Sequence, residues 1–130
     1  MRFQDRADAG RRLGARLADR AGEHPLVVAL PRGGVPVGAE IARALGAPLD
    51  ILVVRKLGHP QQPELGVGAI GEGGTVVLNR DLIAELGVRP EALHEVTARE
   101  ERELERRVDR YRGNRPRADV GGRTVILVDD

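Results

Sequence analysis

Apolar residues follow two patterns along the chain, continuous short runs and stripes with helical spacing. The continuous runs occupy 25–30, 49–57 and the residues directly before Asp129, and their β-branched composition is typical of buried strands. Residues 36–45 carry apolar side chains four positions apart, which predicts a helix. A strand, a helix and a second strand within about 30 residues predict a βαβ unit with a right-handed crossover.

The remaining segments extend this α/β pattern. Residues 4–21 predict an amphipathic helix with one face of small residues. Residues 65–79 predict two short strands around a glycine-rich turn, and 80–87 predict a short helix. A long helix should run from Pro90 to Arg112, with a sparse apolar stripe and many Glu–Arg pairs. The alternation of strands and helices favours an α/β fold with a mostly parallel sheet.

Length and composition fit one globular domain. The chain has 130 residues, of which 41% are hydrophobic and 32% charged. A net charge of +1 and an aromatic content of 2% give no sign of a nucleic-acid or anionic-membrane surface. The absence of cysteine excludes disulfides and thiolate chemistry, and the three histidines share no metal-ligand spacing. Because no signal peptide or spanning segment is evident, a cytoplasmic location is expected.

One compositional bias singles out Lys56. The chain has 21 basic residues, and Lys56 is the only lysine among them. An ammonium is a compact point charge that suits a phosphate differently from a planar guanidinium. Drift in codon use explains the bias without any function, and composition alone favours that explanation.

In a parallel sheet, ligands bind outside the carboxyl ends of the strands. The first strand is followed by Arg32, Gly33 and Gly34, which predict a sharp turn into a helix N-terminus. Backbone N–H groups and the helix dipole attract anions at such a turn. The second strand ends with Arg55 and Lys56. The alternative for residues 32–34 is a plain strand-to-helix turn without a ligand. The alternative for Arg55 and Lys56 is a pair of charges that face solvent.

The last strand ends in two adjacent carboxylates, Asp129 and Asp130. They repel each other unless Mg²⁺ or the hydroxyls of a diol offset their charge. Together with the cationic and N–H groups at the other strand ends, they suit a ligand that carries both phosphates and ribose hydroxyls. A solvated strand end is the alternative.

Three segments of the chain resemble the type I phosphoribosyltransferases, most closely a bacterial branch of that family. They are VVALPRGGVPVGAEIARALGAPLD, ILVVRKLGHPQQPELGVGAIGEGG and GRTVILVDD, in this order over nearly the whole chain. The resemblance implies a Rossmann-like, mostly parallel sheet flanked by helices, with a small hood. It also implies an enzyme that uses 5-phosphoribosyl 1-pyrophosphate (PRPP) with Mg²⁺, in which a nitrogenous base attacks C1′ and pyrophosphate leaves.

The resemblance implies roles for residues near the first two strand ends. Residues 32–34 would form the pyrophosphate loop, with an unusual peptide geometry. Lys56 would lie near the pyrophosphate. From its place at the same strand end, and not from the resemblance, Arg55 is expected to be a further substrate-binding residue. Residues 58–74 would hold the mobile loop that closes over the site and excludes water.

By the same resemblance, Asp129 and Asp130 would bind the 2′- and 3′-hydroxyls of the ribose and, through PRPP, its Mg²⁺. In that family a Gly/Thr-rich loop for the 5′-phosphate follows the acidic pair. The sequence ends at Asp130, so we expect a single domain, 1–130, that is a fragment with weak or no turnover. The expected catalytic residues are Lys56, Asp129 and Asp130.

Two alternatives stay open. The chain could be a non-catalytic module that senses PRPP or a nucleotide. More remotely, VILVDD resembles the first strand of a response-regulator receiver, whose acidic pair binds Mg²⁺, although LPRGG has no place there. The expected partners are small molecules, PRPP and a base, with no nucleic acid and no membrane, and a homodimer is allowed. The sequence does not identify the acceptor base.

Overall fold

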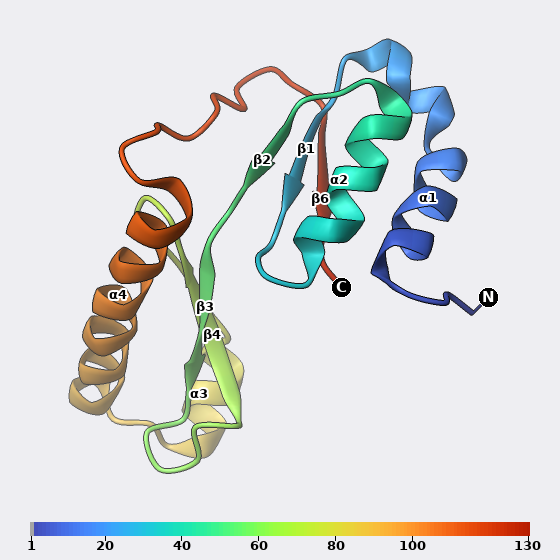
Figure 1. Cartoon of the computed structure of the whole chain (residues 1–130). Helices are drawn as coiled ribbons and strands as arrows, with labels where there is room; N and C mark the ends of the chain where they lie inside the picture. The colour runs from blue at the N-terminus through green and yellow to red at the C-terminus, as the bar shows by residue number, and fades with distance from the viewer. Residues whose placement is uncertain (1) are drawn as a thin grey trace. The chain divides into compact units, whose positions relative to one another are not determined.

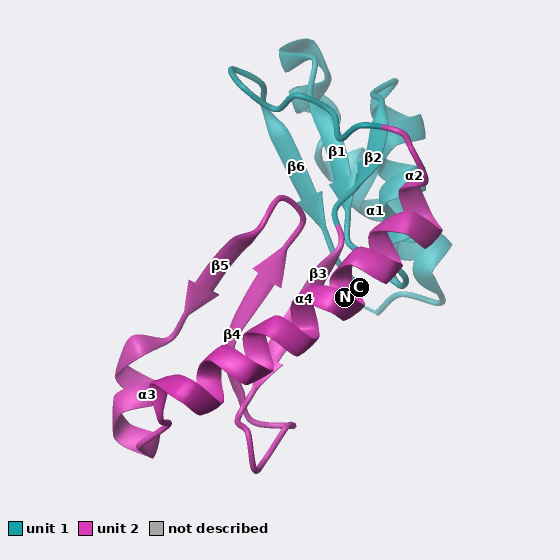
Figure 2. Ribbon diagram, turned by 90° about the vertical axis from the view of Figure 1, so that its left-hand side faces the viewer, with its two compact units in different colours: residues 1–52, 116–130 teal, residues 53–115 magenta. Residues whose placement is uncertain are grey.

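The computed structural model describes residues 2–130, which form two compact units (Figure 2). Unit 1 runs up to Leu52 and takes up the chain again from Pro116 to Asp130. Unit 2 runs from Val53 to Arg115. Each unit has its own sheet, so the two are described in turn.

Unit 1 contains a parallel sheet in the order β2–β1–β6. Its strands are β1 (Leu26–Ala29), β2 (Leu49–Ile51) and β6 (Val125–Val128). Both neighbours run parallel to β1, and all four residues of β1 are buried. The apolar run at 25–30 is therefore the central strand of this sheet, as such runs predict.

Two helices stack on one face of the unit 1 sheet (Figure 1). Helix α2 (Gly34–Leu45) lies against the strands, and α1 (Arg6–Arg16) packs on α2. Gly10 makes this approach close, because a Cβ there would lie 2.6 Å from a backbone oxygen of α2. The single helix expected over 4–21 is wrong at its end, because α1 stops at Arg16 and a 3₁₀ helix, η1 (Ala18–Glu23), follows it. The core consists of Val27, Val37, Ile41, Ala42, Leu45 and Val128.

Unit 2 contains an antiparallel sheet in the order β3–β4–β5. Helix α4 lies against β3 and β4, while the short helix α3 follows β5. These elements match the hairpin, short helix and long helix expected from the sequence. Their bounds are β3 (Val54–Gly58), β4 (Gly66–Gly71), β5 (Thr75–Leu78), α3 (Arg80–Leu86) and α4 (Pro90–Arg112).

The single strand expected over 49–57 is wrong. The chain forms β2, breaks at residues 52–53 and then forms β3, and these two strands join different sheets. An unbroken apolar run carries no mark of such a change, because both strands bury part of their side chains. Residues 66–71 form β4, the first of the two short strands expected over 65–79, so only part of the range 58–74, which was expected to hold the mobile loop, is irregular.

A buried ion pair fixes the end of α4 within unit 2. Arg112 Nε and Nη2 each donate to the Glu72 carboxylate at 3.0 Å, and both side chains are at most 5% exposed. Glu72 Oε1 also accepts the Val53 N–H at 2.9 Å. One carboxylate thus joins the β4–β5 turn to the entry of β3 and to the last turn of α4.

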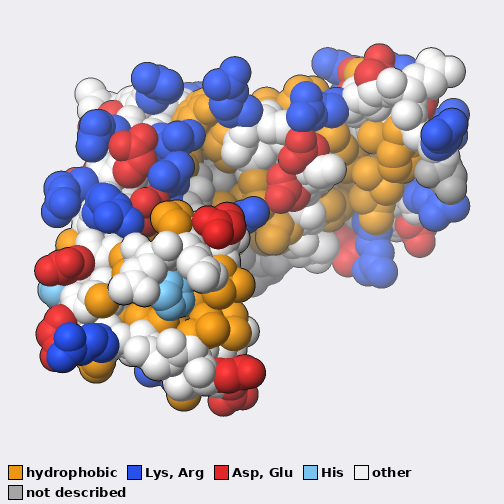
Figure 3. Space-filling model, turned by 90° about the horizontal axis from the view of Figure 1, so that it is seen from below, with side chains coloured by type: hydrophobic (Ala, Val, Ile, Leu, Met, Phe, Trp, Pro, Cys, Tyr) orange, Lys and Arg blue, Asp and Glu red, His pale blue; other side chains and the backbone are white. Residues whose placement is uncertain are grey.

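Charged side chains of both signs are mixed over the surface seen in Figure 3. This distribution agrees with the net charge of +1 and shows no extended field of one sign on that face. Across residues 2–130, no helix is both long enough and apolar enough to cross a membrane. The longest helix, α4, has 23 residues and a strongly charged sequence.

Candidate functional site

The loop that joins β1 to α2 leaves two backbone donors open. The peptide bond between Pro31 and Arg32 is cis, the kind of unusual geometry expected for this loop. The N–H of Gly34 donates to the carbonyl of Leu30 at 3.0 Å. Within residues 2–130, the N–H groups of Arg32 and Gly33 have no hydrogen-bond acceptor. With the positive end of the α2 dipole beside them, these donors suit an anion.

The same loop packs directly on the end of β6. A Cβ at Gly34 would lie 2.8 Å from the carbonyl oxygen of Val128 and 3.2 Å from the Cα of Asp129. A Cβ at Gly33 would overlap the carboxylate of Asp130. Only glycine permits so close an approach of backbone to its neighbours. The structure therefore brings together the two halves of the site predicted in this unit, the anion loop and the acidic pair.

Each carboxylate of the acidic pair has one oxygen engaged. Asp129 Oδ1 accepts the N–H of Asp130 at 2.8 Å. Asp130 Oδ2 accepts from Arg6, at 2.7 Å from Nη2 and 3.2 Å from Nε. In the described part of the chain, the second oxygen of each carboxylate has no donor. Both residues are exposed, so these two oxygens are candidate acceptors for the two hydroxyls of a vicinal diol.

Arg6 also stabilises the charged form of Asp130. The hydrogen bond from the Arg6 guanidinium is the largest cause that lowers the pKa of Asp130 below its ordinary value of 3.8. An ionised carboxylate such as Asp130 acts as an acceptor only. Arg6 was not predicted from the sequence, because nothing distinguishes it from the other arginines of the chain. Only the packing of α1 on α2 brings it near the other terminus.

Lys56 and Arg55 lie in unit 2, in the middle of an antiparallel strand. The expectation that they end a parallel strand is wrong, since Lys56 lies opposite Ala69 of β4. Arg55 Nε donates to Glu100 Oε2 of α4 at 2.8 Å. Lys56 is exposed and forms no ion pair with any of residues 2–130. Successive residues of a strand face opposite sides, so Arg55 is engaged by α4 while the Lys56 ammonium is available.

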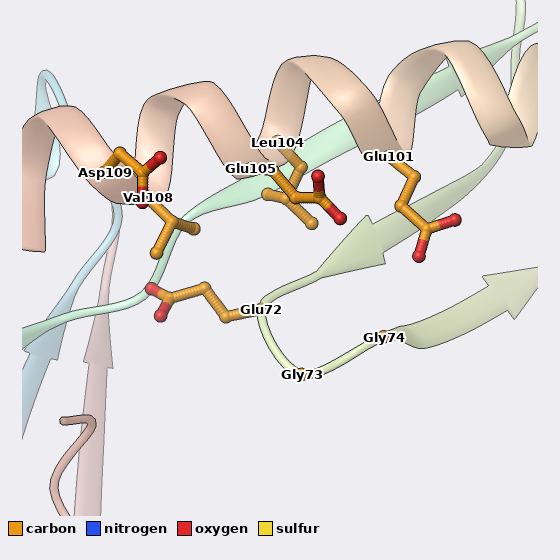
Figure 4. Close-up of a pocket in the computed structure, with 8 residues that line it drawn as sticks. All are labelled: Glu72, Gly73, Gly74, Glu101, Leu104, Glu105, Val108 and Asp109. Carbon is orange, nitrogen blue, oxygen red and sulfur yellow. The ribbon is translucent and has the colours of Figure 1, made fainter. Parts of the chain in front are cut away.

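Unit 2 has a pocket of about 400 Å³ beside the β4–β5 turn (Figure 4). Carboxylates dominate its wall, and the Glu72 carboxylate is held by Arg112. This lining repels phosphates, so the pocket does not suit the phosphate part of the expected ligand. It is lined by Glu72, Gly73, Gly74, Glu101, Leu104, Glu105, Val108 and Asp109.

The acidic side chains do not form a cage for a resident metal ion. Among residues 2–130, no group of three or more His, Cys, Asp or Glu side chains could hold a metal. Asp129 and Asp130 supply only two carboxylates, which leaves most of the coordination of a cation to other ligands. Mg²⁺ commonly keeps several waters and binds substrate phosphates together with one or two carboxylates. The pair therefore fits an ion that arrives with a phosphorylated substrate.

Comparison with known proteins gives one consistent result. A family model described as phosphoribosyl transferase domain matches residues 2–130. Two Mycobacterium tuberculosis proteins, of strains CDC 1551 / Oshkosh and ATCC 25618 / H37Rv, are each named "Putative phosphoribosyl transferase" and are 51% identical over 128 residues. This alignment covers 98% of the chain but 29% of either relative. The crystal structure of TT1426 from Thermus thermophilus is 46% identical, with a TM-score of 0.83, and the match covers 100% of this chain and 62% of that one.

Proposed function

The chain belongs to the phosphoribosyl transferase family, and on that premise we propose that unit 1 holds the ribose and pyrophosphate of PRPP for transfer to a nitrogenous base. The chain spans 29% of the length of the curated relatives that it matches, so the proposal concerns the whole protein that contains it. Family membership also argues against the receiver-like interpretation of VILVDD.

One observation carries the proposal. The open N–H groups of Arg32 and Gly33 lie on a loop that packs against the acidic pair, whose carboxylates each keep one open oxygen. Donors for an anion and acceptors for a diol thus occur side by side. PRPP has this combination, because its pyrophosphate is bonded to C1′ of the ring that carries the 2′- and 3′-hydroxyls.

The proposed reaction needs no covalent enzyme intermediate. The nitrogen lone pair of the base forms a bond to C1′, while the C1′–O bond breaks and its electron pair leaves with pyrophosphate. Positive charge develops on the ribose ring and negative charge grows on the leaving group. Backbone N–H groups at the start of α2 would stabilise the latter, and the carboxylates would orient the sugar.

We further propose that Mg²⁺ and Lys56 stabilise the negative charge of the leaving pyrophosphate. Mg²⁺ would enter as the PRPP complex and offset the charge of the departing pyrophosphate. Lys56 supplies a compact cation, and its lack of an ion pair within residues 2–130 supports this assignment. Arg55 remains a proposed substrate-binding residue, although its guanidinium is engaged by Glu100 in this structure.

The test is transfer of labelled ribose from PRPP to a panel of purine, pyrimidine and other nitrogenous bases. It uses the full-length protein, with nucleotide formation and pyrophosphate release measured together. Replacing both Asp129 and Asp130 by Asn should abolish transfer, because the open acceptors lose their charge. Asp119→Asn is the matched control, since Asp119 is an exposed carboxylate of the same unit that accepts only a local N–H at 3.0 Å.

The same experiment separates catalysis from sensing. PRPP binding without transfer to any base would contradict the enzymatic proposal and support a non-catalytic PRPP-binding module. Failure to bind PRPP at all would contradict both.

A further inference from the structure

Arg6 joins the start of α1 to the far end of the chain. Its Nη2 and Nε both donate to one oxygen of Asp130, Oδ2, at 2.7 and 3.2 Å. The two residues are 124 positions apart in sequence. Because both donors use the same oxygen, Oδ1 of Asp130 is left for another partner.

The fold holds Arg6 in this position through its helix. Asp5 caps α1 by accepting the N–H of Asp8 at 2.7 Å, so the first turn that carries Arg6 is fixed. Gly10 and Gly14 bring α1 into close contact with α2. Helix α2 begins at the loop that packs on the acidic pair. The backbone of Arg6 is thereby placed relative to both halves of the site.

We propose that Arg6 is a positioning residue that orients the Asp130 carboxylate toward a ribose hydroxyl. This inference rests on the proposed function and adds a residue that acts on substrate only through Asp130. An exposed carboxylate rotates freely about its last bond unless a partner holds it. Arg6 already restricts the Asp130 side chain by binding Oδ2. The entropy that Asp130 loses when a hydroxyl binds Oδ1 is therefore smaller.

The first test is the affinity for PRPP in the full-length protein. Both partners are exposed, so Arg6→Gln should raise the Kd and KM for PRPP by roughly three- to fivefold. The KM for the base and kcat at saturating PRPP should not change, because Arg6 touches neither reactant. Arg6→Lys, which keeps one charged donor, should restore most of the affinity.

The matched control is Arg12→Gln on the same helix. The Arg12 side chain is 44% exposed and pairs with Asp8 at 3.2 Å, so its loss removes an ion pair of the same helix away from the acidic pair. Its PRPP affinity should equal that of the wild-type protein. Equal affinities of Arg6→Gln and wild type, or equal losses in Arg6→Gln and Arg12→Gln, would overturn the proposal.

A double-mutant cycle shows whether Arg6 acts through Asp130. In the Asp130→Asn background, Arg6→Gln should cause little or no further loss of PRPP affinity. A loss as large as in the wild-type background would mean that Arg6 contacts PRPP directly or acts through the fold, and it would overturn the proposal. The proposed function fails in a different way, through absence of PRPP binding by the wild-type protein.

Discussion

The two units use the same kind of ion pair in opposite ways. In unit 2, Arg112 and Glu72 are at most 5% exposed and form a bidentate pair, so both side chains are enclosed by the fold. In unit 1, Arg6 and Asp130 have side chains 59% and 39% exposed, and one carboxylate oxygen stays open. Breaking a buried pair is costly, so it fixes a fold, whereas an exposed pair contributes little to stability and leaves its charged groups accessible to solvent.

Removing the guanidinium of the buried pair should have the largest effect on stability. Arg112→Met leaves Glu72 charged and buried, so we expect a loss of about 3–5 kcal/mol in the free energy of unfolding. Chemical denaturation of the full-length protein measures it. Arg110→Met, an exposed residue on the same helix, is the control and should change stability by less than about 0.5 kcal/mol. Similar losses in the two variants would remove the contrast between the units.

A side chain at Gly33 should disrupt the site in unit 1 without a comparable loss of stability. Because the new Cβ would overlap the Asp130 carboxylate, Gly33→Ala should lower kcat/KM for PRPP roughly 100-fold. Gly22→Ala, at a glycine with nothing within 4 Å of the added atom, should leave both properties unchanged. Wild-type kinetics of Gly33→Ala would show that the loop and the acidic pair do not act together.

Replacing Lys56 should have the next largest effect, on the KM for PRPP. Loss of a charged donor to a phosphate should raise the KM for PRPP roughly tenfold or more in Lys56→Ala. The control is Arg102→Ala, which removes an exposed cation from α4. Steady-state kinetics at fixed Mg²⁺ compare the two variants. If both have equal and small effects, Lys56 is an ordinary surface charge.

Acid should weaken unit 1 slightly through Asp8. The N–H of Gln4 is the main cause that lowers the pKa of Asp8 below 3.8, and Arg12 contributes. A pKa lowered by folding gives stability that is present above 3.8 and is lost as pH falls through the lowered value. Asp8→Asn should therefore make unfolding less sensitive to acid below about pH 4. Asp19→Asn removes a carboxylate without an ion pair in residues 2–130 and should leave the acid sensitivity as in wild type.

The sequence predicted elements whose signals are local. Strand β1, the hairpin β4–β5 and the long helix α4 appear where apolar spacing, glycines and Pro90 indicate them. The motif PRGG and the acidic pair were also found, because each stands at the end of a recognisable strand. The glycines of PRGG also allow this motif to contact the acidic pair, since a larger residue at Gly34 would not fit against β6.

Interactions between distant segments could not be predicted in the same way. The break between β2 and β3 lies in an unbroken apolar run, and only strand pairing decides which sheet each half joins. Arg6 and Arg112 are ordinary members of an arginine-rich chain until packing brings each to a carboxylate. Lys56 is conspicuous in composition, yet its availability follows from Arg55 being the residue that faces α4.

The central claim is that the acidic pair holds the ribose while the neighbouring loop holds the pyrophosphate. Calorimetric titration of the full-length protein with PRPP and with pyrophosphate alone, both with Mg²⁺, tests it directly. Replacing Asp129 and Asp130 together by Asn should weaken PRPP binding far more than pyrophosphate binding, because only PRPP carries ribose hydroxyls, whereas Gly33→Ala should weaken both. Equal loss of both ligands in the Asn variant, or no loss of either, would contradict this account.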